Sequence, residues 1–141
     1  PGCREEKRMD GKNHRVKIGN RRAAYAFDAV YEAVNKPSIK SSEYRSYVKK
    51  LPAMIQVNGL GQTLAFCYSK GGAYKEIYDQ IYGWLLKNNP KLFPEKNEEF
   101  VKAVINKNSS EYRVITMEVL ALLNWMRRFA EGMVKQEKEG E

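Results

Sequence analysis

The feature that most constrains this chain is a run of apolar residues near its carboxyl end. Its members recur at alternating steps of three and four positions: Tyr112, Ile115, Val119, Leu122, Met126, Phe129 and Met133. This spacing is that of the buried seam of an amphipathic helix, and no strand has it. Ser109 and Ser110 are predicted to cap the helix, which should extend to Gln136. Because residues 119–123 are apolar on every face, other helices should cover this part of the long helix from more than one side.

Similar patterns predict that the rest of the chain is helical. We expect about six helices with short connections, starting near residues 20, 41 and 60, spanning 73–88, starting near 97, and spanning 109–136. No strand pattern is convincing, so the predicted fold is an all-α, single-domain bundle in which the long carboxyl-terminal helix is central. Residues 1–19 are rich in charge and lack periodicity, so we expect a basic, flexible arm there and a helical domain over 20–141.

Two helices of the predicted domain carry specific expectations. In the first, Asn20 is the expected cap, and the expected buried stripe is Ala23, Phe27, Val30 and Val34. In the second, Pro52 falls inside the helical pattern. A proline there removes one backbone hydrogen bond and crowds the preceding turn, so a kink or break is expected near residues 49–51.

Two glycines punctuate the middle of the chain, in Asn58-Gly-Leu-Gly61. We interpret them as a corner between two helices, with Asn58 or Gly59 in the left-handed conformation that ends the first. A phosphate-binding loop is the alternative. It is less favoured, because no strand precedes the glycines, no third glycine follows, and no Gly-Lys-Ser/Thr occurs.

A ladder of tyrosines recurs at one-turn spacing: Tyr74, Tyr78 and Tyr82. Exposed aromatic rings can stack on the bases of single-stranded nucleic acid. At helical spacing, however, such residues more often belong to the core, and that interpretation is favoured here.

The distribution of charge says more than its total. Residues 1–50 hold 13 of the 25 Lys and Arg but only 6 of the 17 Asp and Glu, and therefore carry +7 of the net +8. A basic excess gathered in one third of a chain suggests a polyanionic partner, although many proteins are basic without one. No apolar run approaches the ~20 residues that a membrane-spanning helix needs, and a cytoplasmic location is expected.

The sequence offers no catalytic constellation. His14 is the single histidine and falls in the predicted arm, while Cys3 and Cys67 have no metal-like spacing. No serine sits on a strand-to-helix elbow, and the carboxylates are dispersed. We therefore predict that the protein is not an enzyme and needs neither a cofactor nor a metal. A metal-independent ribonuclease stays open as an alternative, because such sites leave little trace in a sequence.

Two segments together resemble one known family. They are Leu51-Pro-Ala-Met-Ile55 followed by Asn58-Gly-Leu-Gly-Gln-Thr-Leu-Ala-Phe66, and Leu123-Asn-Trp-Met-Arg-Arg-Phe-Ala-Glu-Gly132. In order, spacing and overall length the chain is similar to the small all-helical subunit of the type III-B CRISPR effector, the fifth member of the Cmr module. The likeness extends from about Arg22 to Met133 and leaves the first twenty residues outside it.

The resemblance implies a non-catalytic subunit of an antiviral ribonucleoprotein. Several copies would stack into a short filament beside the backbone subunits, and together these would line the channel in which guide and target RNA pair. The expected partners are therefore other Cmr subunits, further copies of this chain, and the two RNAs. The candidate RNA contacts are the most prominent basic pairs: Arg21, Arg22, Lys49, Lys50, Arg127 and Arg128. Each could instead be a solvated or salt-bridged side chain.

A subunit contact is predicted on the outer side of the long helix. Leu120 and Asn124 are the candidates, because an apolar residue on an otherwise polar face can mark an interface. Leu120 could equally be covered by another helix of the same domain. The main alternative for the whole protein is a helical protein–protein adaptor without RNA affinity, whose charge serves only solubility.

Overall fold

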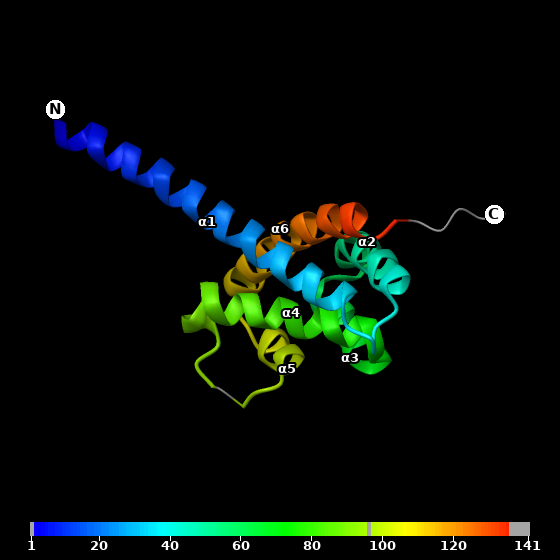
Figure 1. Cartoon of the computed structure of the whole chain (residues 1–141). Coiled ribbons are helices and arrows are strands. Elements are labelled where there is room, and N and C mark those ends of the chain that lie inside the picture. Colours follow the sequence, from blue (N-terminus) through cyan, green and yellow to red (C-terminus); the bar gives the residue numbers. More distant parts are fainter. Residues whose placement is uncertain (1, 96, 136–141) are drawn as a thin grey trace.

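The computed structural model describes residues 2–95 and 97–135, with side chains from residue 17 onward. Every regular element in this part of the chain is helical (Figure 1). The elements are α1 (Gly2–Val34), α2 (Ser41–Asn58), α3 (Leu60–Lys70), α4 (Gly72–Asn88), the short 3-10 helix η1 (Pro90–Leu92), α5 (Phe100–Ile105) and α6 (Ser109–Met133). The prediction of an all-α bundle of about six helices is confirmed.

The long carboxyl-terminal helix α6 is central, as its sequence pattern predicted. It packs most extensively on α1 and α2 and also touches α4 and α5. Its buried residues follow the predicted seam and include members of the stretch 119–123 that is apolar on every face. They are Ile115, Val119, Leu122, Leu123, Met126 and Ala130. Its cap differs from the prediction. The Asn108 side chain, and neither Ser109 nor Ser110, accepts the Glu111 N–H at 2.9 Å. The predicted end at Gln136 lies outside the described residues.

The first helix is longer than predicted. α1 begins at Gly2, so Asn20 lies inside it and the predicted cap there is wrong. The amino-terminal turns project beyond the other helices (Figure 1). Periodicity missed them because a helix that packs against nothing has no apolar stripe, whereas their Lys, Arg and Glu residues favour helix by propensity. The division into an arm over 1–19 and a domain over 20–141 stays a prediction.

The buried stripe of α1 is also rotated from the predicted one. Its fully buried residues are Ala26, Ala29, Val30 and Ala33. Val30 is the one member of the predicted stripe among them, while Ala23 and Val34 are half-buried and Phe27 is 47% exposed. Small alanine side chains let α1 lie close against its neighbours, and this close packing outweighs the burial of the larger Phe27 ring.

The next two helices meet at a glycine corner. α2 continues through Pro52, so no break occurs near residues 49–51. Gly59 then adopts φ 85° between α2 and α3, a conformation that favours glycine. The Gly61 N–H donates to the Tyr112 hydroxyl at 2.7 Å, which ties the start of α3 to α6. The structural interpretation of these glycines therefore holds, and the Gly61 amide is already engaged within the fold.

The tyrosine ladder of α4 lies in the core, as the favoured interpretation predicted. Tyr74 stacks on Tyr47 with ring centroids 3.8 Å apart. Tyr78 is buried, and its hydroxyl donates to Glu99 at 2.6 Å. Tyr82 stacks on Phe100 with centroids 4.7 Å apart. The three rings pack against aromatic side chains of the bundle, among them Tyr47 and Phe100, and are therefore not free to stack on bases.

The described helices include none with the length and apolar character that a membrane span requires.

Candidate functional surface

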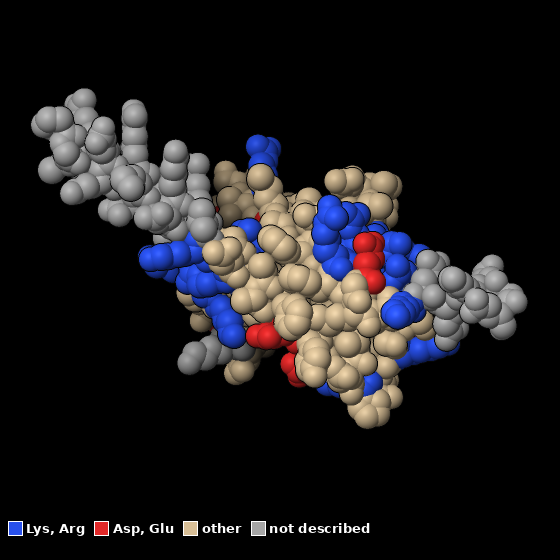
Figure 2. Space-filling model, turned by 45° about the horizontal axis from the view of Figure 1, so that its top comes forward, with Lys and Arg blue, Asp and Glu red and all other residues tan. Residues whose placement is uncertain are grey.

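Four of the six predicted RNA contacts lie on α2 and α6, two helices that pack on each other. Lys49 and Lys50 lie on α2, and Arg127 and Arg128 lie on the last turns of α6. Lys49 Nζ is 3.9 Å from the Glu131 Oε1, and Glu131 is one helical turn beyond Arg127 and Arg128. We term these four residues the basic face. Figure 2 shows Lys and Arg side chains gathered in groups on this side of the molecule, one of them around a small acidic group.

Among the described residues, Glu131 is the carboxylate that pairs with the basic face, and this pairing is weak. The Lys49–Glu131 pair is long at 3.9 Å, and its side chains are 43% and 38% exposed. Exposed pairs of this kind contribute about 0–1 kcal/mol because water and salt screen them. Lys50 and Arg128 are both exposed. The face therefore keeps most of its capacity to neutralise an external anion.

Arg127 is held differently from the other three. It is half-buried, and its Nε is buried without a hydrogen-bond partner in the described structure. A buried N–H without a hydrogen-bond partner lowers the stability of the fold. The strongest hydrogen-bond partner for an arginine N–H is a phosphate or carboxylate oxygen. Arg45 Nε is in the same condition, one turn before Lys49 on α2. Sequence reasoning missed Arg45, although its spacing of four from Lys49 was the available signal.

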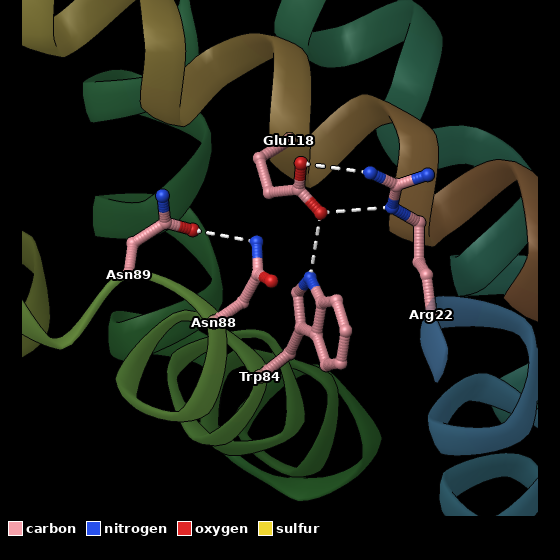
Figure 3. Close-up of polar contacts among 5 residues, drawn as sticks. All are labelled: Arg22, Trp84, Asn88, Asn89 and Glu118. Atoms are coloured by element: carbon pink, nitrogen blue, oxygen red, sulfur yellow. Dashed lines mark hydrogen bonds and ion pairs between the residues drawn. The ribbon is translucent and has the colours of Figure 1, made fainter. Parts of the chain in front are cut away.

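Arg22 lies away from this face and has a partner inside the fold. Its Nε and Nη2 donate to the two carboxylate oxygens of Glu118 at 2.8 and 2.9 Å. Trp84 Nε1 donates to the same carboxylate at 2.7 Å, so the group joins α1, α4 and α6 (Figure 3). The side chains of Arg22 and Glu118 are only 18% and 15% exposed. Because this pairing occupies its guanidinium, we leave Arg22 out of the proposed RNA surface.

The charge state of Glu118 follows from these neighbours. Burial by itself raises the pKa of the carboxyl. The hydrogen bonds from Arg22 and Trp84 and the charge of Arg22 together outweigh burial, so the Glu118 pKa lies below its ordinary value. Glu118 is therefore ionised at neutral pH and forms a charged link between three helices.

Arg21 is exposed and belongs to a different part of the surface. It lines a hollow of about 320 Å³ between α1 and α4, together with Tyr25, Asp28, Trp84 and Lys87 among others. The structure thus separates Arg21 from the basic face.

The two predicted interface residues differ in exposure. Leu120 is half-buried and packs against the core of its own chain. Asn124 is exposed. The domain itself therefore covers part of Leu120. The subunit contact stays a prediction, and Asn124 is the more accessible of its two candidate residues.

The groups that could support catalysis are dispersed or buried in the described structure. Cys67 is buried, and burial raises the pKa of its thiol to about 11, which leaves little reactive thiolate at neutral pH. Among the described residues, no group of three or more His, Cys, Asp or Glu side chains is placed to hold a metal ion. Cys3 and His14 lie outside the residues whose side chains are described.

A helical bundle that carries exposed basic side chains on α2 and α6 is the class of molecule that these features define. A family model described as "CRISPR-associated protein (Cas_Cmr5)" matches residues 18–133. The chain therefore belongs to the Cas_Cmr5 family, and the predicted resemblance is confirmed.

A relative and a solved structure, both from Thermus thermophilus, place the chain within that family. The chain is 30% identical over 118 residues to the CRISPR system Cmr subunit Cmr5 of that organism, and the match covers 81% of this chain and 93% of the relative. The crystal structure of a CRISPR-associated Cmr5 family protein from Thermus thermophilus superposes with a TM-score of 0.66 at 29% identity. That match covers 81% of this chain and 94% of the solved one. Sequence and fold thus agree over nearly the whole length of the relatives.

Proposed function

We propose that this chain is a non-catalytic small subunit of an RNA-guided ribonucleoprotein of the type III-B, Cmr-type CRISPR system, acting in antiviral defence in the cytoplasm. Membership of the Cas_Cmr5 family supports this proposal, since its relative in Thermus thermophilus is a Cmr subunit. The expected partners are other subunits of that complex, further copies of the chain, and guide and target RNA. Stacking of copies would use the outer side of α6 near Asn124.

The observation that carries the RNA contact is the basic face. Lysine and arginine neutralise phosphates without reading base identity. This suits a complex in which base pairing with a changing guide provides the sequence specificity. Lys49, Lys50, Arg127 and Arg128 would therefore hold the backbone of the guide–target RNA, with Arg45 as a fifth contact. The buried Nε groups of Arg45 and Arg127 would gain a phosphate partner.

The test is the salt dependence of RNA binding by the reconstituted complex. Lys50→Glu with Arg128→Glu changes two exposed side chains of the basic face. Each lost phosphate contact lowers the slope of log K against log salt by about 0.7–0.9, so we expect a slope shallower by about 1.4–1.8 and weaker binding at low salt. The matched control is Lys91→Glu with Lys102→Glu, two exposed lysines on η1 and α5, which changes the net charge equally.

Two results would count against this proposal. Equal losses in the two double variants would mean that net charge alone, and not the basic face, governs binding. Unchanged RNA binding by the Lys50/Arg128 variant, in complexes that assemble normally, would favour a protein–protein adaptor whose charge serves only solubility.

A further inference from the structure

Four aromatic side chains form a row on the surface where α1 crosses α6. Trp125 and Phe129 are stacked with ring centroids 5.8 Å apart on α6. Phe129 meets Phe27 of α1 edge-on at 5.3 Å, and Phe27 lies 6.4 Å from the parallel ring of Tyr31. We term these four residues the aromatic row. It is open to solvent, because Trp125, Phe27 and Tyr31 are 39%, 47% and 60% exposed.

The aromatic row adjoins the basic face. Arg128 is three positions beyond Trp125 on α6 and therefore about 60° from it around the helix, whereas Arg127 lies on the flank of α6 that carries Glu131. The row and the basic face therefore meet at Arg128. The nearest acids of α1 line a different surface. Asp28 and Glu32 border the groove between α1 and α4 together with Glu76 and Asp79. The row is therefore an exposed aromatic surface with Arg128 beside it.

We propose that the aromatic row binds unpaired RNA by stacking its rings on exposed bases while the basic face holds the neighbouring phosphates. This inference rests on the proposed function and adds unpaired RNA as a ligand beside the paired guide–target RNA that the basic face would hold. Bases within a duplex are covered by their neighbours, whereas unpaired bases offer a free face to aromatic side chains. Stacking requires no hydrogen bonds to base edges, so it accepts any sequence. The position of cations at the edge of the row favours a polyanion over an apolar protein partner.

The intrinsic fluorescence of the chain provides a direct reading of base stacking. Trp125 is 39% exposed in the row, whereas Trp84 is 4% exposed and donates to Glu118. We expect a non-self-complementary RNA strand to quench the fluorescence of the full-length chain at low salt. The same strand annealed to its complement should quench it much less at equal occupancy. Trp125→Leu should abolish the quenching, and Trp84→Phe should preserve it.

Affinity measurements separate ring stacking from hydrophobicity. Tyr31→Leu and Trp125→Leu keep apolar bulk but remove the rings, and each should weaken single-strand binding about tenfold, with little effect on duplex binding. Tyr68→Leu, which removes a 51% exposed ring on α3 outside the row, is the matched control and should change neither. Thermal unfolding of each variant verifies that the bundle is intact.

The failures of the two proposals are distinguishable. Single-strand binding that depends on Lys50 and Arg128 but not on Tyr31 or Trp125 would overturn the aromatic row and leave the proposed function standing. Absence of RNA binding by both the free chain and the complex would overturn both. Row variants that impair assembly of the complex, while their RNA binding as free chains is unchanged, would identify the row as a protein contact and reject the inference.

Discussion

Glu118 links α1, α4 and α6 through polar contacts in a largely apolar interface. Its carboxylate accepts two hydrogen bonds from Arg22 and one from Trp84. Neither donor has another partner of comparable geometry among the described residues, so removing the carboxylate charge leaves an arginine partly buried and poorly paired. We therefore expect the loss of this contact to lower the free energy of unfolding.

Replacing Glu118 by glutamine should lower the free energy of unfolding at pH 7 by about 1–3 kcal/mol. The native pKa of Glu118 lies below its unfolded value of about 4.3, so the unfolded chain binds the proton more readily. The stabilisation is therefore present above pH ~4.3 and is lost as the pH falls through the native pKa. Urea unfolding of the wild type and of Glu118→Gln should show a difference at pH 7 that shrinks in acid. A difference independent of pH would contradict this assignment.

At the scale of elements, α1 and α4 meet at a glycine that their sequences do not single out. A Cβ at Gly83 would lie 2.6 Å from the Tyr25 hydroxyl, which donates to the Gln80 carbonyl at 2.7 Å. The hydrogen bond fixes the ring, so it cannot easily move aside. The close approach of the two helices therefore depends on the missing side chain at Gly83.

Gly83→Ala should destabilise the protein by about 1–3 kcal/mol, because the clash exceeds the gain in helix propensity. In Tyr25→Phe the obstructing oxygen is absent, so the double variant should be less destabilised than the sum of the single variants. Gly132→Ala is the matched control on α6, since a Cβ there would meet nothing within 4 Å, and it should be neutral or slightly stabilising. Chemical denaturation of the wild type, the two single variants Gly83→Ala and Tyr25→Phe, and their double variant measures this coupling. Strictly additive losses of stability would contradict the packing argument.

At the scale of the whole molecule, the proposal describes a binding surface without catalytic groups. The basic face holds cations that neutralise phosphates, and none of its four residues is a histidine or a carboxylate, the side chains that most often act as general bases. Purified chain incubated with 5′-labelled RNA in the presence of a chelator should therefore leave the RNA intact over hours. Specific cleavage that persists through purification and is lost in Arg127→Ala would instead support the metal-independent ribonuclease.

Much of the fold could be predicted because its signals are local. The spacing of apolar residues in α6 predicted its buried face, and Gly59 marked where α2 ends. Prediction failed where the signal was weak or redundant. Residues 2–19 have no stripe to detect, and Asn108 competes for the cap of α6 with two adjacent serines.

The sequence by itself determined the helices, the central place of α6 and the basic character of the chain, because periodicity and charge are properties of neighbouring residues. The tertiary structure alone decided which cations stand together. It brought Lys49 of α2 to within 3.9 Å of Glu131, one turn beyond Arg127 and Arg128 on α6, and it paired Arg22 with Glu118. It also turned Phe27 toward solvent to form the aromatic row with Trp125. These outcomes depend on how helices distant in sequence pack together, and no local pattern records that packing.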